Sequence, residues 1–321
     1  MRAVLRGVFA IGFAFFAAIA GAQSYPSKPV RVIVPFPPGA GVDIVTRIFT
    51  PKLAEALGQQ FIVDNRSGAA GHIGAEVAAR TSPDGYTLLL TPGSIVISQT
   101  LYPKLTYNIE RDFEPITPVA AAPFVLVVHP SLPVRNVREL IALAKTKPGQ
   151  LYYASTGNGG TPHLAMEVFR MQANINVVHV PYKGTPPAVT DVIAGQVTMM
   201  FANTLSVLPL VKSGRLRALA VSSARRSAAA PELPTVGESG VPGFDATTWF
   251  GLLAPAGTPK EIVARLNGEA RKIGQMPGIR DLLISQGADP LGTTPEEFRA
   301  FIKAELVKWA KAVQAAGVRV E

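Results

Sequence analysis

The sequence contains no cysteine. This absence excludes disulfide bonds, thiol catalysis, thiolate metal sites and a lipid-modified N-terminal cysteine. Enzyme signatures are also lacking: none of the four histidines lies in an H-E-x-x-H pattern, and residues 237–240 lack the Gly-x-Ser-x-Gly nucleophile elbow. We therefore expect no enzymatic activity, no bound metal and no cofactor.

No long apolar run follows the N-terminal region. The apolar run in that region, residues 8–20, is shorter than the ~20 residues that a membrane-spanning helix needs. Arg2 and Arg6 precede it, and a small-residue Ala-Gly-Ala sequence follows at 20–22. This pattern predicts a signal peptide at residues 1–22 and an exported, periplasmic protein, with an uncleaved anchor as the alternative.

Acidic residues are outnumbered, with 22 Asp and Glu against 31 Lys and Arg, which gives a net charge of +9. Removing Arg2 and Arg6 with the leader leaves +7. Such a field can steer anions toward a cleft. The basic residues are scattered and form no run interleaved with aromatics, so we expect no nucleic-acid partner.

Short apolar runs alternate with helical patterns, which is typical of βα units and a mainly parallel sheet. The β-branched run at residues 30–34 and the helical stripe from Ile44 to Leu57 form the first unit, and Pro51 should kink or split that helix. Further strands are expected at 60–64, 86–90, 124–128, 151–154, 177–180, 197–202 and 216–221, and further helices at 73–79, 137–145, 162–171 and 188–194. Thr258 and Thr294 should each cap a late helix.

Two proline-rich connections, 115–123 and 231–242, are candidate crossings between domains. If both are crossings, residues 23–122 and 246–321 form a discontinuous first lobe, and residues 123–245 form the second. This layout leaves a cleft with two crossing segments as its hinge.

Two glycine-rich loops each connect a strand to a helix, at residues 35–43 and 155–163. Free N–H groups at a helix start carry partial positive charge and suit an anion, although the first loop alone is equally well explained as a tight turn. Asp43 would repel an anion, so we expect it to cap the helix or orient loop amides. The second loop matches neither a P-loop nor a dinucleotide fingerprint.

Several other residues are of types found in functional sites, but a structural role explains them more simply. For the glycine cluster at 68–74 a structural role is favoured. His163 and Glu167 could share a helical face, but no third metal ligand is visible, and a capping or core role is favoured. Lys183 is expected in a solvated loop, with Tyr182 a candidate for the cleft wall.

The chain resembles the Bug receptors, the periplasmic solute-binding components of tripartite tricarboxylate transporters. The resemblance covers essentially the whole mature sequence in order. Its matching segments are residues 35–43, 63–75, 82–90, 153–164, 180–195, 214–221, 233–244 and 248–259. It implies a type II periplasmic-binding-protein fold, α/β, with two lobes of mainly parallel sheets and a hinge of two crossing segments.

The resemblance also implies a ligand carboxylate held between the two loops, partly through ordered water. Carried onto this chain, the binding residues are Phe36, Pro38, Gly39, Ala40, Asp43, Ser94, Ser155, Thr156, Gly157, Gly159, Thr161, His163 and Asn203, with His163 as support rather than as a direct contact. Ala40 stands where relatives commonly have glycine, which puts its amide geometry in question. Ser67 replaces a common proline in a turn.

Together these features predict a monomeric solute-binding protein that captures a small carboxylate between two lobes and delivers it to the membrane permease subunits of a tripartite transporter. The ligand class stays open among organic acids, amino acids and aromatic carboxylates. A sensory receptor and, less favoured, a secreted enzyme acting on carboxylates are the alternatives.

Overall fold

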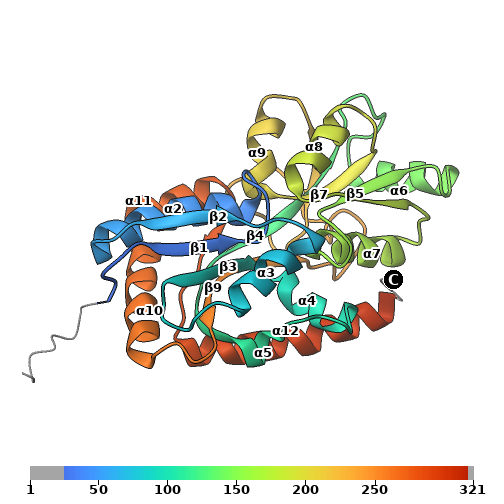
Figure 1. Cartoon of the computed structure of the whole chain (residues 1–321). Coiled ribbons are helices and arrows are strands. Elements are labelled where there is room, and N and C mark those ends of the chain that lie inside the picture. Colours follow the sequence, from blue (N-terminus) through green and yellow to red (C-terminus); the bar gives the residue numbers. More distant parts are fainter. Residues whose placement is uncertain (1–24, 317–321) are drawn as a thin grey trace, which may run out of the picture.

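Figure 1 shows the computed structural model of the chain, which describes residues 25–316. The expected signal peptide, residues 1–22, lies outside the described residues. Two α/β lobes are joined by one long strand, β4 (Phe113–Val128), which crosses from one lobe to the other.

The sheet of the first lobe has the strand order β2-β1-β3-β9-β4. Strand β1 (Val30–Val34) runs parallel to β2 (Phe61–Asn65) and β3 (Thr87–Pro92), whereas β9 (Thr247–Pro255) is antiparallel to both β3 and β4. The short β10 (Asp289–Pro290) pairs with β4.

Both faces of this sheet are covered, so successive β1 residues enter different cores. Val32 packs with residues of α2 (Gly41–Leu57), α10 (Lys260–Gln275) and α11 (Pro277–Ser285). Ile33 packs on the opposite face, which is covered by α3 (His72–Ala79), α4 (Ser94–Leu101) and α12 (Pro295–Ala316). Burial on both faces explains why this strand is apolar at every position except the partly exposed Arg31, which pairs with Asp64. The short η1 (Ala69–Gly71) and α5 (Ile109–Asp112) complete the lobe.

In the second lobe the strand order is β4-β7-β5-β6, with β8 (Arg217–Val221) also paired to β4. Strand β5 (Tyr152–Ser155) is parallel to β6 (Val178–Pro181) and to β7 (Met199–Asn203). One core forms beneath α6 (Val137–Thr146) and α7 (Thr161–Ala173), and the other beneath α8 (Thr185–Ile193) and α9 (Thr204–Lys212).

The type II fold predicted from the sequence is confirmed, with differences in detail. The outer strands are parallel as expected, but β4 and β9 run antiparallel at the centre, because the chain crosses between lobes along them. Helix α2 is not split at Pro51, an exposed position where the carbonyl that proline leaves unpaired can be hydrated. Thr294 forms the expected capping box with Glu297, whereas the Thr258 hydroxyl instead bonds the Pro255 carbonyl.

Two backbone segments link the lobes where β4 leaves the first sheet and where β9 enters it. Pro123 pairs with Thr247 in the first sheet, and the next residue, Phe124, pairs with Asn203 in the second. Because β4 belongs to both sheets, the lobe boundaries at 122/123 and 245/246 remain a prediction.

Ser222 joins both crossing segments. Its hydroxyl accepts a hydrogen bond from the Phe124 amide at 2.8 Å and donates to the Ala246 carbonyl. Its own amide donates to the Phe124 carbonyl, and its carbonyl accepts from the Ala246 amide. Ser222 is fully buried, so these bonds are not exchanged with water.

We expect Ser222→Ala to lower the free energy of unfolding by about 2–4 kcal/mol, because it leaves two buried main-chain groups without their side-chain partner. The urea denaturation midpoint should fall accordingly. The control is Ser223→Ala, which removes a hydroxyl bonded to Arg225 near the surface and should change stability by less than about 0.5 kcal/mol. Equal losses of unfolding free energy in both variants would contradict the role of Ser222 in linking the two crossing segments.

Candidate binding site

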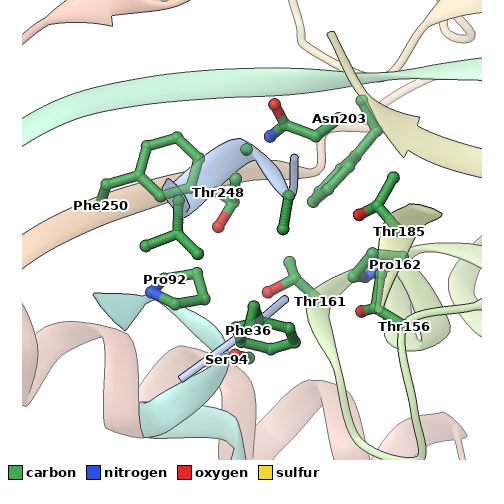
Figure 2. A pocket seen from close by; sticks show the side chains of 14 residues that line it. Phe36, Pro92, Ser94, Thr156, Thr161, Pro162, Thr185, Asn203, Thr248 and Phe250 are labelled. Carbon is green, nitrogen blue, oxygen red and sulfur yellow. The ribbon is translucent and has the colours of Figure 1, made fainter. Parts of the chain in front are cut away.

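A cavity lies between the lobes where the two crossing segments meet them (Figure 2). The space between its lining atoms, including the mouth, is about 410 Å³. Both lobes contribute to the wall, which consists of Phe36, Ala40, Gly41, Val42, Pro92, Ser94, Phe124, Thr156, Thr161, Pro162, Thr185, Asn203, Thr248 and Phe250. No lining side chain is charged.

The first predicted loop reaches the cavity at only some of its positions. Phe36 and Ala40 line it, whereas Pro38 and Gly39 are exposed and are not part of its wall. Asp43 is buried and faces away from the cavity wall, toward the loop itself. Its carboxylate accepts hydrogen bonds from the Gly39 amide at 2.9 Å, from Asn65 at 3.0 Å and from Arg47 at 3.0 Å.

Burial alone would raise the pKa of Asp43, but the hydrogen bonds from Arg47, Gly39 and Asn65 outweigh it and hold the pKa below its usual value. The carboxylate is therefore ionised, and both of its oxygens accept hydrogen bonds from neighbouring groups. This arrangement agrees with the expectation that Asp43 orients loop amides.

The second predicted loop divides in the same way. Thr156 and Thr161 line the cavity, whereas Ser155, Gly157, Gly159 and His163 are not part of its wall. The His163 ring nitrogen Nδ1 accepts the Gly159 amide at 3.0 Å, and the Ser155 hydroxyl is 2.6 Å from Nε2 of His179. His163 thus supports the loop and does not line the cavity.

The His163 and His179 rings stack at 4.0 Å between centroids, and the Tyr153 ring lies 4.8 Å from the ring of His179 and 6.3 Å from that of His163. Burial lowers the pKa of His163, and burial together with the neighbouring His163 ring lowers the pKa of His179 to about 3. Both rings are therefore neutral near pH 7, which leaves Nδ1 of His163 free to accept the Gly159 amide.

Beneath the rings, Glu167 is held by the Tyr153 hydroxyl at 2.6 Å and by the Arg170 guanidinium at 2.7 Å. These bonds outweigh its burial and keep the pKa of Glu167 low. His163 and Glu167 are thus bonded to different partners, His163 to the Gly159 amide and Glu167 to Tyr153 and Arg170, and both have structural roles. Across residues 25–316, no group of three His, Asp or Glu side chains is placed to hold a metal ion.

Five helices begin at this cavity. Gly41, Ser94, Thr161 and Thr185 are the first residues of α2, α4, α7 and α8, and Asn203 is the N-cap of α9. In the first four, no side chain caps the free N–H groups. Each helix start carries roughly half a positive charge, so the cavity is electropositive without any cationic side chain.

The Thr161 hydroxyl is a buried polar group that faces this cavity. The residue is only 3% exposed, and within residues 25–316 its oxygen has no hydrogen-bond partner. Figure 2 shows it near the middle of the cavity, with Thr156 and Thr185 on the same side and Phe250 and Pro92 across from them. Ser94 and Asn203, placed on the cleft wall by the family resemblance, line the cavity too.

Several lining residues were missed by the sequence analysis: Gly41, Val42, Pro92, Phe124, Pro162, Thr185, Thr248 and Phe250. Thr185 follows Gly184 at a helix start, a signal that could have been used. Phe124 and Thr248 lie in the crossing segments, and only the three-dimensional path of the chain brings them to the cavity.

The lobes touch each other around the site. The Tyr102 hydroxyl donates to the Asn158 carbonyl at 2.7 Å, and the Ser206 hydroxyl donates to the Gly39 carbonyl at 3.1 Å. Gly157, at a φ of 126°, lies so close to Ala70 that an added Cβ would be 3.3 Å from its methyl carbon. The glycine cluster at 68–74 therefore also abuts the second loop across the cleft.

Two α/β lobes, a hinge of two strands and a cavity between them define a solute-binding protein of the type II class. Residues 45–318 match the family described as "Tripartite tricarboxylate transporter family receptor". The chain belongs to this family, whose members are receptors and not enzymes.

Individual relatives agree with this assignment. The chain is 38% identical to the protein BugT of Bordetella pertussis over 317 residues, which cover 98% of this chain and 97% of BugT. The structure of Rpa4515 of R. palustris with adipate is 35% identical with a TM-score of 0.90, covering 92% of this chain and 99% of that one. MatC of Rhodopseudomonas palustris with bound malate is 29% identical with a TM-score of 0.85, covering 90% and 100%.

The Bug resemblance inferred from the sequence is therefore confirmed.

Among residues 25–316, no helix combines the length and apolar character needed to cross a bilayer.

The neutral histidines predict that stability falls with acidification. Below about pH 6.5 the unfolded chain takes up protons at these histidines that the folded protein does not, so the free energy of unfolding decreases as the pH drops toward the lowered folded-state pKa. The melting temperature should therefore fall from about pH 7 to about pH 5, and His179→Asn should reduce this dependence.

His129→Asn is the matched control, because His129 lies near the surface and outside the stack. It should retain the pH slope of the unaltered protein. If His179→Asn retains that slope as well, His179 is not held neutral in the folded state.

Proposed function

We propose that this protein is a periplasmic receptor that captures a small carboxylate between its lobes and delivers it to the membrane permease subunits of a tripartite transporter. The observation that carries the proposal is the unpartnered, buried Thr161 hydroxyl in a cavity where five helices begin. A hydroxyl buried in this way lacks the hydrogen bond that a ligand oxygen can supply.

The chemistry of the wall favours an anion. Free N–H groups at helix starts donate hydrogen bonds, and their dipoles stabilise negative charge. Hydroxyls of Ser94, Thr156, Thr161 and Thr185 add further donors. A carboxylate offers about four acceptor sites on two oxygens, so it can receive donors from both lobes at once.

We assign two roles to the predicted site residues. Phe36, Ala40, Ser94, Thr156, Thr161 and Asn203 contact the ligand, together with Thr185 and Thr248. Gly39, Asp43, Ser155, Gly157, Gly159 and His163 hold the loops in place, and Pro38 lies at the rim. The related structures with adipate and malate support a carboxylated ligand for this chain as well.

The family and the predicted leader support the proposed delivery and location. A receptor for a tripartite transporter must present its loaded form to permease subunits, and interlobe contacts such as that between Ser206 and Gly39 provide a closed form to present. The net charge of +7 expected after removal of residues 1–22 favours encounter with anions. We propose that the receptor acts as a monomer.

Thr161→Val tests the proposed anchor. The substitution keeps the shape of the side chain and removes the hydroxyl, so carboxylate affinity should fall by about tenfold to a hundredfold, the usual value of a hydrogen bond to a charged group. Stability without ligand should stay the same or rise, because the hydroxyl has no partner to lose. Calorimetric titration with a panel of carboxylates and thermal unfolding measure the two effects.

Thr190→Val serves as the control, since its hydroxyl bonds the Pro186 carbonyl on the exposed side of α8. This variant should bind as the unaltered protein does. If no carboxylate in the panel raises the melting temperature of the unaltered protein, the proposed function is wrong.

A further inference from the structure

The cavity is rich in hydrogen-bond donors and poor in groups that accept from a cation. Its wall contains no Asp or Glu. The helix starts at Gly41, Ser94, Thr161 and Thr185 all present the positive ends of their dipoles to the same space. A positive charge placed there meets repulsion from several directions.

The Asp43 carboxylate, although close to the cavity in the sequence, is not available to a ligand. Asp43 lies two residues after the lining Gly41, but its side chain is 3% exposed and both of its oxygens are engaged. Oδ1 accepts from Asn65 and Arg47, and Oδ2 accepts from the Gly39 amide. An ammonium group cannot use it without dismantling the first loop.

The other acceptor side chains in the wall are uncharged. The Asn203 side-chain oxygen accepts the Leu205 amide at 3.2 Å as the cap of α9. The threonine and serine hydroxyls can accept a hydrogen bond, but they carry no negative charge to balance a buried cation. Burying an ammonium group without a charged partner is strongly unfavourable.

The rest of the wall suits an uncharged carbon skeleton. Phe36, Phe124 and Phe250 bring three aromatic rings to the cavity, and Pro92 and Val42 add apolar surface. In Figure 2, Phe250 and Pro92 lie across the cavity from Thr156 and Thr185, so the side opposite these hydroxyls is largely apolar.

We infer that the site selects carboxylates that lack an ammonium group, namely organic or aromatic acids, and discriminates against α-amino acids. This inference rests on the proposed function and narrows its ligand class. It applies to the closed cavity, where the ligand is separated from water by both lobes.

Matched pairs test the selection by calorimetric titration of the mature protein, with Trp249 fluorescence as a second readout because its neighbours Thr248 and Phe250 line the cavity. The pairs are succinate with aspartate, glutarate with glutamate, and butyrate with 2-aminobutyrate. Within each pair only the ammonium group differs. We expect the amino acid to bind on the order of a hundredfold more weakly wherever its partner binds.

The outcomes separate the two proposals. If amino acids bind within about threefold of their partners, the selection is wrong while the proposed function stands. If neither member of any pair binds, and no other carboxylate does, both proposals are overturned. Preference for the amino acid in any pair also overturns the selection.

A charge introduced into the wall provides an independent test. Ser94→Asp places a carboxylate at the first residue of α4, a position where helices tolerate acidic side chains. Relative to the neutral control Ser94→Asn, it should weaken succinate and strengthen aspartate, shifting their affinity ratio by at least about tenfold. An unchanged ratio would show that ammonium binding is not limited by missing negative charge.

Discussion

Partial positive charge gathered at one point is the constraint on which the rest of this molecule depends. Helices α2 and α4 of the first lobe and α7, α8 and α9 of the second all begin at the cavity. No acidic side chain lies in the wall, and the carboxylate of Asp43, in the first turn of α2, is paired with Arg47. Bringing them together costs electrostatic free energy, which an enclosed anion offsets. Such an anion would therefore favour contact between the lobes as well as binding to each.

The groups behind the cavity keep these donors in place without carrying net charge into it. Asp43 is balanced by Arg47 on the first loop, and Glu167 by Arg170 beneath the second. Between Glu167 and the second loop lie the stacked neutral rings of His163 and His179, which accept from or bond to loop atoms. Ser222 ties the two hinge segments through main-chain groups adjoining the cavity.

Local patterns in the sequence were enough to predict the strand–loop–helix units. The β-branched run of β1 and the glycines after it identified the first loop, and the hydroxyl-rich segment from Ser155 identified the second. The family resemblance added Ser94 and Asn203. The antiparallel centre formed by β4 and β9 was not predicted, because pairing between residues more than a hundred positions apart leaves no local periodicity.

The same limit explains the missed wall residues. Phe124, Thr248 and Phe250 belong to the crossing strands, and nothing in their neighbouring sequence marks them as lining a cavity. The role of Asp43 was predictable because it acts on residues four positions away. The stacking of His163 on His179 was not, since it depends on how α7 packs against β6.

Main-chain amides at the helix starts are less sensitive to amino-acid substitution than the side chains of the cavity wall. Every residue except proline supplies the same N–H group, so substitutions at most helix starts leave the anchor for the anion intact. The wall opposite is made of replaceable side chains such as Phe36, Val42 and Phe250. If the ligand is a carboxylate, as we propose, a gene duplicate could acquire a differently shaped ligand through a few wall substitutions and still bind the carboxylate group in the same way.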